Sequence, residues 1–179
     1  MKRPETKRAL VVGLGLTGFS CVRYLHAQGY QVSVVDTRAQ PPKLDELQRE
    51  FPSVTVHTGG LPTALFNHPG LLVVSPGVSL KEAEIARAIS NGAEAIGDIE
   101  LFARAARAPV IAITGANGKS TVTALTGAMC AAAGLKTAVG GNIGVPALSL
   151  LEEDEPDVYV LELSSFQLET TWSLNARAA

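Results

Sequence analysis

Residues 110–121 read Val-Ile-Ala-Ile-Thr-Gly-Ala-Asn-Gly-Lys-Ser-Thr, and this stretch decides the fold of the second half of the chain. The run 110–113 is short, apolar and mostly β-branched, as expected of a strand buried in a parallel sheet. A turn of small residues, 114–118, follows it, and an alanine-rich helix begins after the turn. A strand, a glycine loop, Lys-Ser and a helix form the layout of a phosphate-binding loop. In such a loop, backbone N–H groups and the helix N-terminus face the anion.

The loop is a variant of the Walker A pattern, because the standard spacing requires glycine where this chain has Ile113. In the pattern, Lys119 reaches the β- and γ-phosphates and the Ser120 hydroxyl can bind Mg²⁺. The alternative is a plain strand-turn-helix corner with a solvated lysine.

A second glycine pattern lies near the start of the chain. Residues 13–18 read Gly-Leu-Gly-Leu-Thr-Gly between an apolar run, 9–12, and a helical pattern that ends near Gly29, and Asp36 stands at the end of the next apolar run. G-x-G-x-x-G with an acid about 20 residues on predicts a nucleotide diphosphate over the helix N-terminus and a ribose or base near Asp36. The alternative is a doubly wound domain that binds nothing there.

The remaining pattern alternates strands and helices and predicts an α/β protein in two parts. Residues 1–97 form a doubly wound, Rossmann-like parallel sheet domain with further strands at 54–57, 71–74 and 94–96 and helices at 43–50 and 81–90. Residues 98–179 form an incomplete P-loop-type α/β domain. It contains a helix capped by Asp98, helices at 120–133 and 147–151, strands at 110–113, 137–139 and 158–161, and a glycine turn at 140–144.

Two further features stand at the ends of predicted strands. Ser75-Pro76-Gly77 follows the strand 71–74, on the edge where ligands bind in open α/β sheets, although such a turn can also merely turn the chain. Glu162 ends the apolar run 158–161, where a carboxylate resembles a Walker B acid and can hold Mg²⁺ opposite Ser120. The alternative for Glu162 is a capping or surface glutamate.

Composition excludes several classes of function. The 179 residues are 46% hydrophobic and 18% charged, with a net charge of −2 and no basic stripe, which argues against nucleic acid as the main partner. The charged N-terminus lacks the apolar region of a signal peptide, and no apolar run approaches the roughly 20 residues of a membrane span. Two scattered cysteines fit buried positions in a reducing cytoplasm, and three scattered histidines indicate no metal site.

The motifs together resemble those of the Mur ligases of peptidoglycan synthesis. The resemblance lies in residues 114–121, 140–144 (Gly-Gly-Asn-Ile-Gly) and 161–169 (Leu-Glu-Leu-Ser-Ser-Phe-Gln-Leu-Glu). The stretches 13–18, 36–38 (Asp-Thr-Arg), 75–77 and 97–102 (Gly-Asp-Ile-Glu-Leu-Phe) resemble more narrowly the members that join D-glutamate to UDP-N-acetylmuramoyl-L-alanine. The likeness covers the whole chain.

The resemblance implies an ATP-dependent amide-bond ligase of the cytoplasm that uses ATP and Mg²⁺, acts through an acyl phosphate and binds UDP rather than a dinucleotide at the first glycine loop. It assigns Lys119 and Glu162 to catalysis, and Ser120 and Glu162 to the metal. The implied ATP-binding residues are Gly115, Ala116, Asn117, Gly118, Lys119, Ser120 and Thr121. The implied UDP-muramoyl residues are Leu16, Thr17, Asp36, Thr37, Arg38, Ser75, Gly77, Asn142 and Gln167.

Two other functions remain open from the sequence. An NAD(P)-dependent oxidoreductase would explain the first glycine loop and Asp36, but it leaves 110–169 unexplained. A non-catalytic nucleotide-binding module is the third hypothesis. The family's later histidine, carbamylated lysine, adenine pocket and third domain have no counterpart in these 179 residues, so we expect this portion alone not to ligate D-glutamate.

Overall fold

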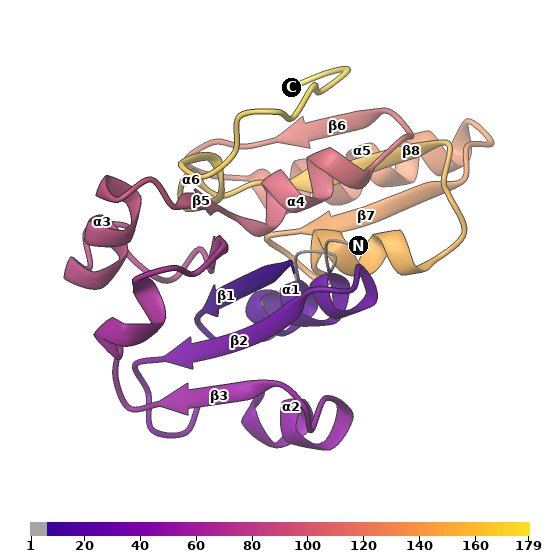
Figure 1. Ribbon diagram of the computed structural model, residues 1–179. Coiled ribbons are helices and arrows are strands. Elements are labelled where there is room, and N and C mark those ends of the chain that lie inside the picture. Colours follow the sequence, from indigo (N-terminus) through magenta and orange to yellow (C-terminus); the bar gives the residue numbers. More distant parts are fainter. Residues whose placement is uncertain (1–6) are drawn as a thin grey trace, which may run out of the picture. The chain divides into compact units, whose positions relative to one another are not determined.

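The computed structural model describes residues 7–179, which fall into two compact units (Figure 1). The first unit ends at Ile96 and the second begins at Gly97. Each unit is built on its own parallel sheet, which confirms the predicted α/β class with parallel strands. Within 7–179, no helix combines the length and the apolar character needed to cross a membrane.

The first unit contains a five-stranded sheet in the order β3-β2-β1-β4-β5, with every neighbouring pair parallel. Its strands are β1 (Arg8–Val12), β2 (Gln31–Asp36), β3 (Thr55–Thr58), β4 (Leu71–Val74) and β5 (Glu94–Ile96). Its helices are α1 (Leu16–Ala27), α2 (Leu44–Glu50), the short 3-10 helix η1 (Thr63–Phe66) and α3 (Ala83–Ser90). The order reverses direction between β1 and β4, so their carboxyl ends border the crevice where doubly wound sheets bind ligands.

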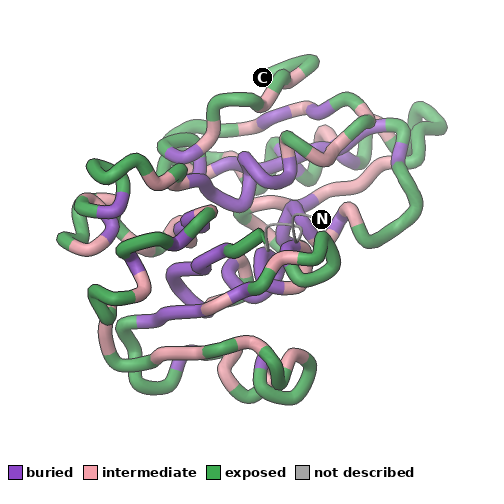
Figure 2. Tube along the Cα trace, viewed as in Figure 1, coloured by how far each residue is buried: buried purple, intermediate pink, exposed green. Residues whose placement is uncertain are grey.

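The core of this unit lies on both faces of the sheet, and the central strands are buried along most of their length (Figure 2). On one face, Leu10 and Val12 of β1 pack in a cluster that includes Phe66 of η1 and Ile85 of α3. Successive strand residues point to opposite faces, so Leu10 and Val12 share a face while Val11 belongs to the other. The 3-10 helix was not predicted from the sequence, because four residues are too few to show a helical period.

The first glycine loop is held by a close approach between two of its own glycines. Gly13 has φ +94°, and a Cβ atom on Gly18 would lie only 1.9 Å from the carbonyl oxygen of Gly13. Gly15, between them, has ordinary extended backbone and open space where a Cβ would go. The loop therefore needs glycine at 18 for packing and not at 15.

We expect Gly18→Ala to lower the free energy of unfolding by about 1–3 kcal/mol, because the added methyl group forces the start of α1 away from the loop. Gly15→Ala is the matched control in the same loop, and its cost should stay below about 1 kcal/mol. Urea denaturation of both variants measures the difference. Equal costs at the two positions would contradict the close packing at Gly18.

The second unit contains a three-stranded parallel sheet in the order β6-β8-β7. In chain order its elements are α4 (Asp98–Ala105), β6 (Val110–Ile113), α5 (Lys119–Ala132), β7 (Thr137–Gly141), the 3-10 helix η2 (Ala147–Glu152), β8 (Val158–Glu162) and α6 (Ser165–Leu168). All five residues of the central strand β8 are buried. A single bridge between Ile111 and Ala178 places the last residues of the chain along the free edge of β6.

Three details differ from the sequence prediction. Asp98 is the first residue of α4 and Gly97 is the capping residue, so the predicted cap at Asp98 is wrong. Gly140 and Gly141 end β7 instead of beginning a turn, and 147–152 is a 3-10 helix. The reason at Gly140 is close packing, because a Cβ there would lie 2.3 Å from the carbonyl oxygen of Val145.

Candidate functional site

The carboxylate of Glu162 is the centre of the candidate site in the second unit. Glu162 ends β8, where it is paired in register with Ile113 on one side and Gly141 on the other. Its Oε2 accepts a hydrogen bond of 2.7 Å from the Ser120 hydroxyl, and its Oε1 accepts one of 2.7 Å from Asn142 Nδ2. The side chain is only 2% exposed. Residues from two glycine-containing segments thus meet on one buried carboxylate.

The backbone after β7 places Asn142 beside Glu162. Gly141 has φ +105°, and a Cβ on it would lie 2.4 Å from the Glu162 carbonyl oxygen. The Asn142 N–H donates a 2.8 Å hydrogen bond to that same carbonyl. Only glycine allows this approach at 141, so the Gly-Gly-Asn sequence is explained by the position of the asparagine.

The loop 114–118 presents backbone to solvent in front of α5. Gly118 has φ +74° and caps the helix, while Gly115 has φ +142°. The Lys119 side chain folds back so that Nζ donates a 2.9 Å hydrogen bond to the Gly115 carbonyl. The loop residues are exposed, so free N–H groups and a lysine ammonium lie together at a helix N-terminus. This arrangement suits a bound phosphate group.

The donor set beside the loop fits a magnesium ion. The Ser120 hydroxyl and the Glu162 carboxylate are hard oxygen donors already 2.7 Å apart. Mg²⁺ in nucleotide sites is commonly held by one or two protein oxygens and completed by water and phosphate oxygens. Across residues 7–179, no group of three or more His, Cys, Asp or Glu side chains could hold a metal by itself. Ser120 and Glu162 are therefore the residues that would hold an ion shared with a nucleotide.

The segment after β8 is tied down by the side-chain amide of Gln167. Ser164 and Gln167 form a capping box around α6: the Ser164 side chain accepts from the Gln167 N–H, and Gln167 Oε1 accepts from the Ser164 N–H. Gln167 Nε2 donates a 2.9 Å hydrogen bond to Asp98 Oδ2, and the residue is 2% exposed. The predicted contact of Gln167 with a muramoyl group stays a prediction, since both ends of the amide hydrogen-bond inside the protein.

Asp98 is a buried carboxylate with few donors around it. It is 1% exposed, and its Oδ1 has no hydrogen-bond partner within the described part of the chain. Burial raises the pKa of Asp98 to about 6, and the hydrogen bonds from Gln167 and from the backbone N–H groups of Asp98 and Ile99 offset this only in part. A carboxyl group with this pKa is largely protonated in mildly acidic solution.

Glu100, two residues further along α4, has the opposite environment. It is completely buried, and its Oε2 accepts from the backbone N–H groups of Trp172 and Ser173. Its Oε1 accepts from the Ser173 hydroxyl and from Arg104 Nε. Burial alone would raise the pKa of Glu100, but these hydrogen bonds outweigh it and lower the pKa to about 2. Sequence reasoning gave neither Asp98 nor Glu100 this anchoring role, and the only signal was acids interleaved with Ile99 and Leu101.

In the first unit, Asp36 plays a similar anchoring role. Its Oδ2 accepts a 2.7 Å hydrogen bond from the Leu14 N–H of the glycine loop, and both oxygens accept from Arg38. Asp36 is 2% exposed, whereas the Arg38 side chain is 51% exposed. Burial alone would raise the pKa of Asp36. The hydrogen bonds from Arg38 and Leu14 lower the pKa by more than burial raises it, so the net shift is downward. Asp36 thus orients the loop and the guanidinium.

The other predicted residues of this unit gather at the same carboxyl edge of the sheet. Ser75 follows β4 and donates a 3.1 Å hydrogen bond from Oγ to the Gly13 carbonyl, beneath the loop. Leu16 opens α1 and is 52% exposed. The set at this edge is Leu16, Thr17, Asp36, Thr37, Arg38, Ser75 and Gly77, while Asn142 and Gln167 lie in the second unit.

Both units match domains of one known protein family. The N-terminal domain of MurD-like Mur ligases matches residues 7–97, and the Mur ligase middle domain matches residues 113–178. The chain belongs to the Mur ligase family. Its two glycine loops are therefore the loops of the first two domains of that family.

The curated relatives of this Mur ligase chain are similar along its whole length. A UDP-N-acetylmuramoylalanine–D-glutamate ligase from Marinobacter nauticus is 60% identical over 173 residues, which is 97% of this chain and 39% of that protein. The enzyme of the same name from Methylobacillus flagellatus is 55% identical over 181 residues, 100% of this chain and 40% of that protein. The chain thus spans about 40% of the length of these relatives.

Solved structures share the fold. A UDP-N-acetylmuramate:L-alanyl-gamma-D-glutamyl-meso-diaminopimelate ligase from Neisseria meningitides superposes with a TM-score of 0.56 at 19% identity, covering 88% of this chain and 52% of that one. A murein peptide ligase from Psychrobacter arcticus gives 0.53 at 19% identity, covering 87% and 37%. At this identity the likeness establishes the fold of the Mur ligase chain and nothing finer.

We expect Asp98→Asn to change how stability depends on pH. The folded-state pKa of about 6 lies above the ordinary value of 3.8, so the stabilisation from the neutral carboxyl is fully present below about pH 4 and is lost as pH rises through 6. Since an asparagine side chain does not titrate, the free energy of unfolding of wild type relative to this variant should fall by up to about 3 kcal/mol between pH 4 and 8.

Urea denaturation of wild type and Asp98→Asn between pH 4 and 8 measures the difference in their free energies of unfolding. The other titrating groups cancel in this difference because both proteins contain them. Asp154→Asn is the matched control, because the Asp154 side chain is 98% exposed. Its difference from wild type should stay flat. A flat difference for Asp98→Asn as well would contradict a raised pKa at Asp98.

Proposed function

We propose that this chain is the UDP-substrate-binding and ATP-binding portion of a ligase that joins D-glutamate to UDP-N-acetylmuramoyl-L-alanine in the cytoplasm. The observation that carries the proposal is the 52–60% identity to enzymes of that name over 95–100% of the chain. The similarity extends through both glycine loops and the segment around Glu162, which are the parts of the chain suited to phosphate and metal binding.

The proposed reaction has two steps that balance without a further reactant. A carboxylate oxygen of UDP-N-acetylmuramoyl-L-alanine attacks the γ-phosphorus of ATP, which forms an acyl phosphate and releases ADP. The amine nitrogen of D-glutamate then attacks the acyl carbon, and the tetrahedral intermediate expels phosphate and loses a proton to give the amide. Negative charge develops at the phosphoryl oxygens in the first step and at the acyl oxygen in the second. Positioned donors are therefore the main contribution expected of the protein.

The second unit would supply these donors to ATP. The backbone N–H groups of 115–118 and the ammonium of Lys119 would bind the phosphates, and Lys119 would exchange its bond to Gly115 for one to a phosphate oxygen. Ser120 and Glu162 would hold Mg²⁺, which when bound neutralises phosphate charge. Asn142 keeps the Glu162 carboxylate in place from the opposite side.

The first unit would bind the UDP end, and the environment of Asp36 favours this over a nicotinamide cofactor. An acid that binds the ribose of a dinucleotide must offer a free oxygen to the ribose hydroxyls. The two oxygens of Asp36 already accept four hydrogen bonds, two each, so no lone pair is left for a ribose hydroxyl. Recognition would then fall to the exposed guanidinium of Arg38 and to the backbone of the loop, with Asp36 as a positioning residue.

We expect UDP to bind residues 1–179 and NADH not to bind, as measured by calorimetric titration. Arg38→Ala should lower the affinity for UDP at least tenfold, because a charge-assisted hydrogen bond contributes about 1.5–3 kcal/mol to binding. Arg49→Ala is the matched control, since Arg49 is 72% exposed on α2. NADH binding tighter than UDP-N-acetylmuramoyl-L-alanine would instead favour an oxidoreductase.

We expect two substitutions in the second unit of residues 1–179 to weaken ATP binding for different reasons. Lys119→Ala should lower ATP affinity at least tenfold with or without Mg²⁺, because it removes a charge from the phosphates. Glu162→Gln should leave the affinity for metal-free ATP unchanged and abolish the increase in ATP affinity that Mg²⁺ gives. Fluorescent ATP displacement with and without Mg²⁺ separates the two.

Lys136→Ala and Glu153→Gln are the matched controls, because both side chains are exposed in the same unit. They should bind Mg-ATP as wild type does. If Lys119→Ala binds ATP normally, or if Glu162→Gln keeps the full effect of Mg²⁺, the role assigned to that residue is wrong.

A further inference from the structure

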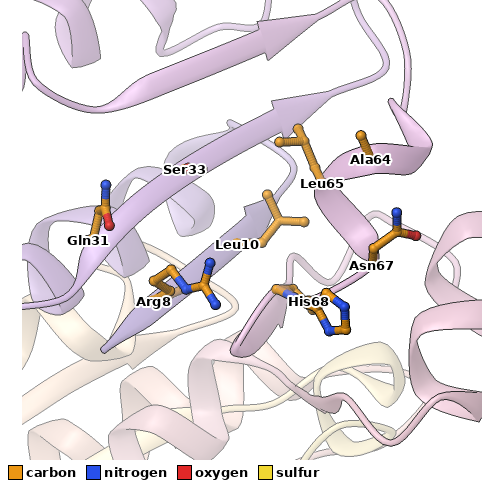
Figure 3. Close-up of a pocket in the computed structure, with 10 residues that line it drawn as sticks. Arg8, Leu10, Gln31, Ser33, Ala64, Leu65, Asn67 and His68 are labelled. Atoms are coloured by element: carbon orange, nitrogen blue, oxygen red, sulfur yellow. The ribbon is translucent and has the colours of Figure 1, made fainter. Parts of the chain in front are cut away.

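We propose that the amino-terminal edge of the first sheet carries a second binding site, one that takes a small organic anion, a phosphate or a carboxylate, with a ring-sized apolar body. The site is a pocket of about 480 Å³ over β1 and β2 and beside η1, shown in Figure 3. We call it the amino-edge pocket and define it by Arg8, Gln31, Ser33, Leu65, Asn67 and His68. Its volume lies within the range of about 300–1,000 Å³ typical of small-molecule sites.

The pocket opens where one face of the sheet changes from apolar to polar. Across β1 and β2, Val12 is paired with Val35, and both belong to the apolar cluster on that face. Two residues earlier Leu10 is paired with Ser33, and two residues before that Arg8 is paired with Gln31. All of these side chains share one face of the sheet, because successive side chains of a strand point to opposite faces and every second one points the same way. Arg8 and Gln31 are exposed and Ser33 is half-buried, so this polar stretch of the face is open to a ligand, whereas the apolar stretch is buried in the core.

The polar side chains of the pocket are free to bind a ligand. Within residues 7–179, the side chains of Arg8, Gln31, Ser33, Asn67 and His68 make no hydrogen bond or ion pair with the rest of the protein. Arg38 and Arg104, by contrast, each bind a carboxylate. The amino-edge pocket therefore gathers donors and acceptors that nothing within that part of the chain satisfies.

The charge of the pocket favours an anion. Arg8 contributes a permanent positive charge, and among residues 7–179 no Asp or Glu lines the pocket. A smaller adjoining pocket of about 290 Å³ shares Arg8, Asn67 and His68 and also contains no acid. Within the described residues, therefore, the charge that faces the pocket is positive although the chain as a whole has a net charge of −2.

The arrangement of side chains indicates the class of ligand. The planar fork of Arg8 matches the oxygens of a carboxylate or phosphate, and the imidazole of His68 lies on the same side of the pocket in Figure 3. Leu10, which is 2% exposed, and the half-buried Leu65 supply an apolar wall beside them. The amides of Gln31 and Asn67 and the Ser33 hydroxyl can bind polar groups on the body of the ligand.

The amino-edge pocket is separate from the carboxyl edge where UDP is proposed to bind. Arg8 and Gln31 begin their strands, whereas the glycine loop and Asp36 stand at the other ends. Strand residues advance by about 3.3 Å each, so the length of β1 puts about 13 Å between the two edges. An anion in this pocket would not overlap a nucleotide at the loop, and the inference does not depend on the proposed function.

Nuclear magnetic resonance titration of ¹⁵N-labelled residues 1–179 tests the site with phenyl phosphate, benzoate and neutral benzyl alcohol as probes. We expect saturable shifts of the amide signals of 8–10, 31–33 and 64–68 with at least one of the two anions, and binding of benzyl alcohol at least tenfold weaker. The tighter of the two anions identifies the ligand as a phosphate or a carboxylate. Saturating UDP should leave this binding unchanged.

Arg8→Gln should lower the affinity for the anion at least fivefold. Ser33→Ala should also lower this affinity while leaving the fold intact. Arg49→Gln is the matched control, because it removes an exposed arginine of the same unit without touching the pocket. The absence of saturable shifts, equal binding by wild type and Arg8→Gln, or equal affinity for benzyl alcohol would each overturn the proposal.

Discussion

The buried carboxylate of Glu162 constrains the whole second unit. A carboxylate at the end of a central strand loses its hydration on folding, and that cost is recovered only if hydrogen-bond donors replace water at both oxygens. The two donors, Ser120 and Asn142, come from the start of α5 and from the residue after β7. Satisfying one charge therefore fixes the phosphate loop and the second glycine segment relative to the same strand end.

The same constraint operates in the first unit, where Asp36 ends β2 and binds the N–H of Leu14 and the guanidinium of Arg38. In both units the acid at the strand end accepts hydrogen bonds from the protein at both oxygens and is almost fully buried; Asp36 accepts four such bonds and Glu162 two. This suits sites for nucleotides, because an uncompensated carboxylate beside a phosphate would repel it. What faces outward is instead the exposed backbone of the loops and the side chains of Arg38 and Lys119. The acids thus hold the loops in place, and the cations and N–H groups are left free for phosphate, while Glu162 and Ser120 together keep oxygen donors for a metal ion.

Much of this could be predicted from the sequence, because its signals are local. Apolar runs followed by glycine loops located the strands and the helix starts, and the positions of Asp36 and Glu162 at strand ends followed from the same runs. The contacts that tie distant segments together left no comparable signal. Gln167 meets Asp98, and the backbone of Trp172 and Ser173 meets Glu100, across about 70 residues that no periodicity connects. Gly140 also carried an ambiguous signal, since glycine is required both in turns and where backbones approach closely.

Asp98 and Glu100 show how the hydrogen bonds to an enclosed carboxylate decide whether the effect of burial on its pKa is overcome. Both are essentially inaccessible and lie two residues apart in the first turn of α4, yet their pKa values shift in opposite directions. Glu100 receives four hydrogen bonds and stays ionised, whereas Asp98 receives one side-chain hydrogen bond and has an oxygen with no partner. Residues two apart on a helix point in different directions, so the two acids hold different parts of the segment that follows β8. Glu100 holds the far end of this segment, at Trp172 and Ser173. The Glu100 carboxylate stays charged across the physiological pH range, because its pKa of about 2 lies far below that range. Asp98 holds Gln167, close to Glu162, through a group that gains charge near pH 6, so the attachment nearest the candidate site is the one whose strength depends on pH.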